Sequence, residues 1–110
     1  MFEHLFYYIN TKRGITMRPL IKADVICLHT KDGKVEPIRI RITDEDGQNQ
    51  AFSIKEYSDI SHQGARTMPD GYVVSDNTLN FYCKIIVFGR EKKIRLFSNP
   101  PYLEWMITHF

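Results

Sequence analysis

The stretch LNFYCKIIVFGREKKIRLFS, residues 79–98, decides the fold that this sequence predicts. Apolar and polar residues alternate on both sides of the Gly89-Arg90 dipeptide, which is the pattern of a β-hairpin with a two-residue loop. A loop at that dipeptide fixes which residues face each other across the hairpin. The predicted facing pairs are Ile85 with Ile94, Lys84 with Arg95, Cys83 with Leu96 and Tyr82 with Phe97.

The predicted hairpin has two unlike faces, because the side chains of a strand alternate between the two sides of a sheet. One face is apolar and carries Phe81, Cys83, Ile85, Val87, Ile94 and Leu96. The other mixes aromatic and basic groups and carries Tyr82, Lys84, Ile86, Phe88, Lys93, Arg95 and Phe97. The apolar face must be buried, either by closure of the sheet or by packing on another layer.

Two further hairpins are predicted upstream. Residues 22–30 and 34–43 alternate around Asp32-Gly33, a dipeptide typical of two-residue loops. That loop pairs Cys27 with Ile38, Val25 with Ile40, Ala23 with Ile42 and Asp24 with Arg41. A three-residue loop at residues 45–47 then places Phe52 opposite Ile40 and Ile54 opposite Ile38, with Gly47 in the left-handed position of a bulged turn. We therefore expect Ile40, Phe52, Ile85 and Ile94 in the core.

The remaining segments are less regular. Residues 56–67 form either a bent strand or a long loop, and Pro69-Asp70-Gly71 turns the chain into a short strand over residues 72–75. Residues 102–110 fit a helix or a strand, and their β-branched and aromatic residues favour the strand. Residues 2–9 place apolar side chains at helical spacing, which predicts a short N-terminal helix. We expect residues 1–16 to be an appendage with a linker and residues 17–110 to be one β-barrel domain.

The predicted fold is therefore all-β, with six or seven short antiparallel strands in meander order that close into a small barrel. Two stretches also carry a resemblance: residues 84–96 and Glu104-Trp105-Met106-Ile107. They look similar to a group of small uncharacterised β-barrel proteins of Gram-positive bacteria. The resemblance implies a compact barrel with a closing strand at Trp105, and it implies no activity.

Composition narrows the class of protein. A formal net charge of +2 is too small to indicate nucleic-acid binding by itself, because sequence-independent phosphate binding needs a concentrated basic patch. Cys27 and Cys83 both fall at inward positions of predicted strands, where a free thiol behaves as a small apolar group. With no disulfide framework, no basic n-region at residues 1–4 and no long apolar run, we expect a cytoplasmic protein without a membrane segment.

The first candidate binding surface is the aromatic and basic face of the 79–98 hairpin, through Tyr82, Lys84, Lys93, Arg95 and Phe97. Rings within a basic track are what single-stranded nucleic-acid binders use. The other interpretation is that a neighbouring strand or the C-terminal segment covers the rings, while Glu91 or Glu104 neutralises the cations. In both cases an acidic group is expected nearby, because like charges directly opposite each other destabilise a sheet.

Two weaker patterns concern catalysis and metals. Asp59, Ser61 and His62 in the 56–67 segment have the residue types of a nucleophile, a base and an orienting acid. Cys27 and His29 point to the same face of one strand, but a tetrahedral zinc site needs a second pair of ligands. We therefore predict no metal, no cofactor and no catalytic residue.

The leading functional prediction is a non-catalytic β-barrel module that associates with a protein partner or with itself. The alternative is a barrel that binds single-stranded nucleic acid on the outer face of the 79–98 hairpin. A small enzyme with its site in the 56–67 segment comes third.

Overall fold

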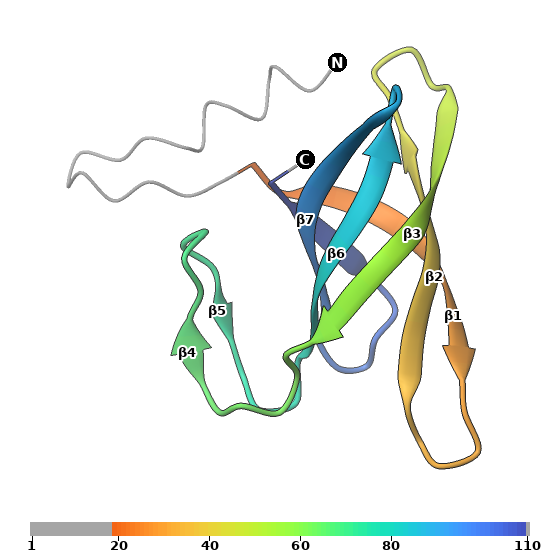
Figure 1. Ribbon diagram of the computed structural model, residues 1–110. Helices are drawn as coiled ribbons and strands as arrows, with labels where there is room; N and C mark the ends of the chain where they lie inside the picture. Colours follow the sequence, from red (N-terminus) through yellow and green to blue (C-terminus); the bar gives the residue numbers. More distant parts are fainter. Residues whose placement is uncertain (1–18, 110) are drawn as a thin grey trace, which may run out of the picture.

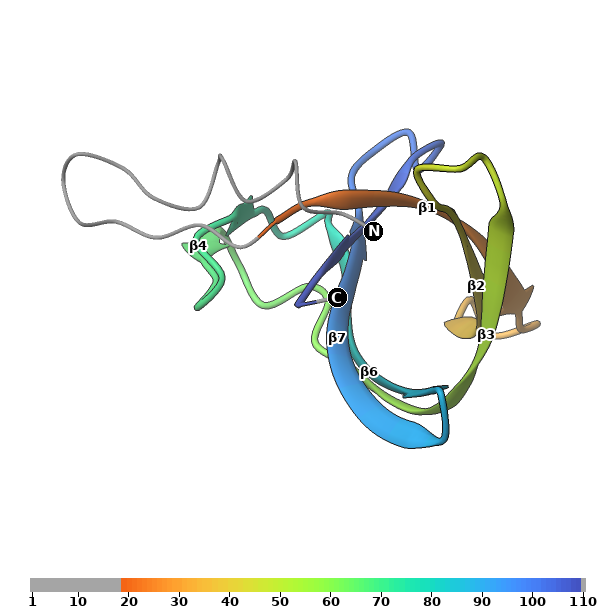
Figure 2. The ribbon, with the colours of Figure 1, turned by 90° about the horizontal axis from the view of Figure 1, so that it is seen from above.

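The computed structural model describes residues 19–109, and this range is all-β. Six strands form a closed antiparallel barrel in the order β1-β2-β3-β6-β7-β8 (Figures 1 and 2). Their bounds are β1 Ile21–His29, β2 Val35–Thr43, β3 Asn49–Asp59, β6 Leu79–Val87, β7 Arg90–Ser98 and β8 Trp105–Thr108. The predicted all-β barrel is confirmed, whereas the predicted N-terminal helix and appendage lie outside the described residues.

The barrel interior is the hydrophobic core, to which the six barrel strands contribute. Its buried members are Ile21, Ile40, Ile42, Phe81, Cys83, Ile85, Ile94, Leu96 and Ile107. Ile40, Ile85 and Ile94 are fully buried as predicted, and Phe52 is half-buried against the same cluster. Closure of the sheet therefore buries the apolar face that the alternating pattern indicates.

The turn between β1 and β2 differs from the prediction. Its loop has three residues, Lys31–Gly33, because the Thr30 N–H donates to the Lys34 carbonyl over 2.9 Å. The Gly33 N–H closes the turn on the Thr30 carbonyl over 3.1 Å. One extra loop residue shifts the pairing near the turn by one position, so the predicted two-residue loop is wrong.

A β-bulge in β2 removes this shift. Cys27 pairs with Pro37 instead of Ile38, while Ile26 pairs with Arg39, so Ile38 has no residue directly opposite. Beyond the bulge the register is as predicted, with Asp24 opposite Arg41 and Val25 opposite Ile40. The bulge turns Ile38 outward, and the expectation that Ile38 faces the interior is wrong.

The β2–β3 hairpin follows the prediction from its turn to Arg39 and Ser53, but the predicted pair of Ile54 with Ile38 does not form, and Ile54 pairs with Ile85 of β6. Ile40 lies opposite Phe52, and the Gly47 N–H donates to the Asp44 carbonyl over 3.0 Å. Gly47 has a φ of 79°, the left-handed conformation that a bulged three-residue turn requires. Turn chemistry and hydrophobic pattern agree here, which is why the register could be predicted.

The β6–β7 hairpin turns one residue earlier than predicted. Phe88 and Gly89 occupy the turn with φ values of 49° and 77°, the geometry of a type I′ loop. Each facing pair therefore moves by two positions, so Lys84 lies opposite Lys93 and Arg95 opposite Tyr82. The predicted pairs of this hairpin are wrong. The prediction of its apolar face is confirmed, because an even shift leaves every side chain on its own face.

The C-terminal segment forms the strand β8, as favoured, and closes the barrel between β1 and β7. The expected strand near residues 72–75 is β5, Val73–Val74, but it does not join the meander. It pairs with β4, Arg66–Thr67, and we call the segment from Arg66 to Val74 the side hairpin. Figure 1 shows the side hairpin beside the barrel, on the route from β3 to β6.

Candidate functional site

The five residues of the predicted binding face lie in two different environments. Arg95 and Phe97 are buried, with exposed fractions of 0% and 5%. Tyr82, Lys84 and Lys93 remain nearer the surface, where they line a hollow of about 510 Å³. A ligand on this face would therefore miss two of the five predicted side chains.

The side hairpin is what covers Arg95. Nε and Nη2 of Arg95 donate to the two carboxylate oxygens of Asp70, over 2.5 and 3.0 Å, and Nη1 donates to Asn80 Oδ1 over 2.8 Å. The Thr108 hydroxyl donates to Asp70 over 2.6 Å, and the guanidinium lies 4.3 Å from the ring centre of Phe97. A buried ion pair with its hydrogen bonds satisfied in this way fastens the side hairpin to the barrel.

Asp70 is held in its ionised form. Burial alone would raise the pKa of Asp70, but hydrogen bonds from Arg95 and Thr108 and from the Tyr72 N–H outweigh burial and lower it. A carboxylate does lie beside Arg95, but it is Asp70 and not the predicted Glu91 or Glu104, and the facing pair of Lys84 with Arg95 on which the prediction rested does not form. Asp70 was missed because its only local signal is that of a turn residue.

Lys84 also has acidic neighbours. Its Nζ lies 2.6 Å from Glu56 and 3.8 Å from Glu91. The hydrogen bond with Glu56 raises the pKa of Lys84 and lowers the pKa of Glu56. The surface part of the predicted face therefore carries both acidic and basic side chains. Lys84 forms ion pairs there, whereas Lys93 forms none with the residues that the structure describes.

The 56–67 segment is held by contacts to backbone groups. Asp59 accepts from the Ser61 N–H over 2.9 Å, and Ser61 Oγ accepts from the Asn80 N–H over 2.8 Å. The imidazole Nδ1 of His62 lies 2.8 Å from the Asp76 carbonyl oxygen. Each of the three side chains thus shapes a loop, and they do not converge as a nucleophile, a base and an orienting acid would.

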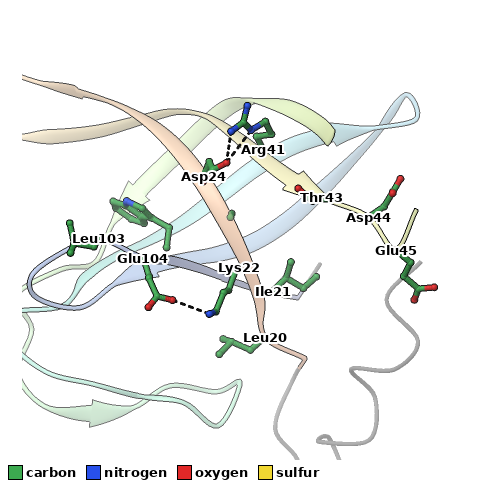
Figure 3. Close-up of a pocket in the computed structure, with 12 residues that line it drawn as sticks. Leu20, Ile21, Lys22, Asp24, Arg41, Thr43, Asp44, Glu45, Leu103 and Glu104 are labelled. Atoms are coloured by element: carbon green, nitrogen blue, oxygen red, sulfur yellow. Dashed lines mark hydrogen bonds and ion pairs between the residues drawn. The ribbon is translucent and has the colours of Figure 1, made fainter. Parts of the chain in front are cut away.

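A groove of about 590 Å³ runs over the start of β1, the end of β2 and the start of β8 (Figure 3). Figure 3 shows two ion pairs in it, Lys22 with Glu104 at 3.2 Å and Arg41 with Asp24 at 2.6 Å. Carboxylates outnumber cations among its lining residues: Asp24, Asp44, Glu45 and Glu104 against Lys22 and Arg41. The groove is therefore acidic.

A second surface feature is the far end of the β1–β2 hairpin, which extends beyond the rest of the barrel (Figure 1). We call it the projecting ribbon and define it as Asp24–His29 of β1 with Val35–Ile38 of β2. Three large aliphatic side chains are exposed on it: Ile26 at 63%, Leu28 at 50% and Ile38 at 47%. Ile26 and Leu28 lie on the outer face of β1 with Asp24, because the side chains of a strand alternate between its two faces, and the bulge in β2 adds Ile38.

The projecting ribbon has two unlike edges. Along β1, β8 pairs only with Ile21–Ala23, and over Asp24–His29 the strand pairs with β2 alone within residues 19–109. Along β2, the ribbon carries Pro37, which lacks an N–H, and the Tyr57 hydroxyl of β3 bridges to Glu36 over 2.7 Å. The outer edge of β1 thus offers unpaired backbone groups next to aliphatic side chains, which is the usual condition for strand addition.

Cys27 and His29 lie on this ribbon but find no further ligands. No group of three or more His, Cys, Asp or Glu side chains suited to a metal ion occurs within residues 19–109. Burial raises the pKa of the Cys27 thiol, and it raises that of Cys83 to about 12. Both cysteines of the described chain are free thiols.

Fold and surface together define, over residues 19–109, a small closed β-barrel in which the outer edge of β1 is unpaired from Asp24 to His29. The described residues include no helix that is long and apolar enough to cross a membrane. No protein-family model, no curated protein and no solved structure matches the chain. The resemblance to β-barrel proteins of Gram-positive bacteria and the cytoplasmic location therefore stay predictions.

Proposed function

We propose that this protein is an association module that binds an additional β-strand along the outer edge of β1, from Asp24 to His29. The observation that carries the proposal is that, among residues 19–109, the outer edge of β1 is unpaired over Asp24–His29 and the same strand exposes Ile26 and Leu28. In strand addition, main-chain hydrogen bonds supply affinity, and pockets or surfaces for alternate side chains supply specificity. The projecting ribbon has both components.

The contrast with other strand edges supports this choice. Natural proteins usually protect edges with charged residues, proline or a covering segment. The β2 side of the ribbon has Pro37 and the Tyr57–Glu36 bridge, whereas β1 presents aliphatic side chains between Asp24 and Thr30. An exposed edge of this kind invites association, so we assign it to the function of the module.

Neither of the other two predicted functions has a comparable observation in its favour. A nucleic-acid strand would need a basic aromatic track, but Arg95 and Phe97 are buried and Lys84 is neutralised by Glu56. An enzyme in the 56–67 segment would need converging polar side chains, and those of Ser61 and His62 bind separate backbone groups.

Peptides selected from a displayed random library test the proposal without knowledge of the natural partner. Binders should carry alternating aliphatic residues, as expected of an added strand. Leu28→Lys should weaken their binding at least about 30-fold, since it places a charge within the apolar part of the contact. The matched control is Ile86→Lys, an exposed aliphatic position on β6, which should bind as the wild type does. Peptides that bind the Leu28→Lys variant equally well would contradict the proposal.

A further inference from the structure

We infer that the strand that adds to β1 is β1 of a second copy of this chain, in an antiparallel two-fold arrangement centred on Cys27. This inference rests on the proposed function and specifies its partner. The joined strands would form one four-stranded sheet in the order β2-β1-β1-β2. Because the pairing is antiparallel, the two barrels lie at opposite ends of that sheet.

The side chains of the edge select this register. A two-fold axis at Cys27 places Ile26 of each copy opposite Leu28 of the other, which makes two apolar cross-strand pairs. An axis at Ile26 would place the charged Asp24 of each copy opposite the apolar Leu28 of the other. An axis at Leu28 would place Asp24 of each copy opposite Asp32 in the turn of the other, which brings two carboxylates together. The Cys27 register is the one in which the exposed aliphatic side chains meet each other and the acidic ones stay apart.

Charge complementarity at the ends of the pairing also favours a second copy. The register brings the Lys31–Lys34 turn of one copy toward the Leu103–Glu104 end of the acidic groove of the other (Figure 3). Lys31 and Lys34 are exposed, and within residues 19–109 neither forms an ion pair. Each dimer would contain this contact twice, because the interface is two-fold.

The arrangement makes a direct chemical prediction about Cys27. Opposed residues of antiparallel strands have Cα atoms about 4.5–5.5 Å apart, which is within the range of a disulfide. Diamide should therefore join Cys27 of the two copies, removing two protons and two electrons from the two thiols and becoming the corresponding hydrazine. Mildly alkaline solution is needed, since burial raises the pKa of this thiol. Cys83 is buried in the core and should not react.

The test combines sedimentation velocity over a range of protein concentrations with this cross-linking, on the full chain. We expect a monomer–dimer equilibrium and a covalent dimer that is lost in Cys27→Ser. Leu28→Lys should weaken dimerisation at least about 100-fold, because the change occurs twice in the interface, and Ile86→Lys should have no effect. Lys31→Glu with Lys34→Glu should also weaken the dimer, whereas Lys93→Glu should not.

The register is tested separately in the Cys27→Ser background. Mixed Ile26→Cys and Leu28→Cys proteins should cross-link to each other, and Ile26→Cys alone should not form a covalent dimer. A chain that stays monomeric while selected peptides still bind the β1 edge would overturn the dimer and leave the proposed function intact. A dimer that tolerates Leu28→Lys, or that does not cross-link at Cys27, would overturn the interface.

Discussion

Replacing Asp70 with alanine should lower the free energy of unfolding by about 3–5 kcal/mol, because it leaves the buried charge of Arg95 without its counter-ion. Both side chains have an exposed fraction of 0%, so water cannot take the place of the carboxylate. Urea denaturation of the variant and the wild type measures the difference. The matched control is Asp24→Ala, which breaks an equally short but exposed pair with Arg41 and should have a much smaller effect.

A double variant separates the ion pair from simple packing. In Asp70→Leu with Arg95→Met, both charges are absent, and replacement of a buried pair by apolar residues is often close to neutral. We expect the double variant to regain most of the stability that Asp70→Ala loses. A double variant as unstable as Asp70→Ala would show that the side hairpin depends on something other than this pair.

The same contact predicts how stability depends on pH. The pKa of Asp70 is lower in the folded protein than in the unfolded chain, where an aspartate titrates at about 3.9. The contribution of Asp70 is therefore fully present above that value and is lost as the pH falls through the lower folded pKa. Denaturation curves at decreasing pH should show a steeper loss for the wild type than for the Asp70→Leu and Arg95→Met double variant.

Truncation of Ile85 to alanine should lower the free energy of unfolding by about 2–5 kcal/mol, through lost apolar burial and the cavity left behind. Ile85 is fully buried at the centre of the barrel, opposite Ile54 of β3. Its neighbour Ile86 points outward, so Ile86→Ala removes the same atoms from the other face and should cost less than about 1 kcal/mol. Equal losses for the two variants, measured in urea, would contradict the assignment of the faces of β6.

Most of the fold could be predicted because the faces of its strands and one of its turns depend on residues that are close together in the sequence. Alternation identifies the faces of the long strands, and Gly47 with its three-residue loop fixes the β2–β3 register. The β6–β7 register could not be fixed in this way, since a shift by two leaves every face unchanged. In the structure Phe88 adopts the left-handed conformation, which is rare for a residue with a side chain, and no local sequence pattern indicates that Arg95 binds Asp70.

The candidate site was less predictable, because it depends on relations between distant segments. Burial of Arg95 requires a side hairpin whose anchor lies 25 residues away in the sequence. Exposure of Ile38 requires a bulge that compensates for an extra loop residue, and neither leaves a clear trace in the alternation. The open edge of β1 exists because β8 pairs with only Ile21–Ala23, which is a property of barrel closure.

The central claim is that the outer edge of Asp24–His29 is open in the monomer and becomes paired on association. Amide hydrogen exchange, measured residue by residue along β1, tests this claim most directly. In dilute solution, fast and slow amides should alternate over this range, because alternate N–H groups point toward β2 and away from it. Arg95–Phe97 of β7, between β6 and β8, should be protected throughout. Association, by higher protein concentration or a selected peptide, should slow the fast amides of β1. Uniform protection of Asp24–His29 in dilute protein, or fast amides that association leaves unchanged, would contradict the account.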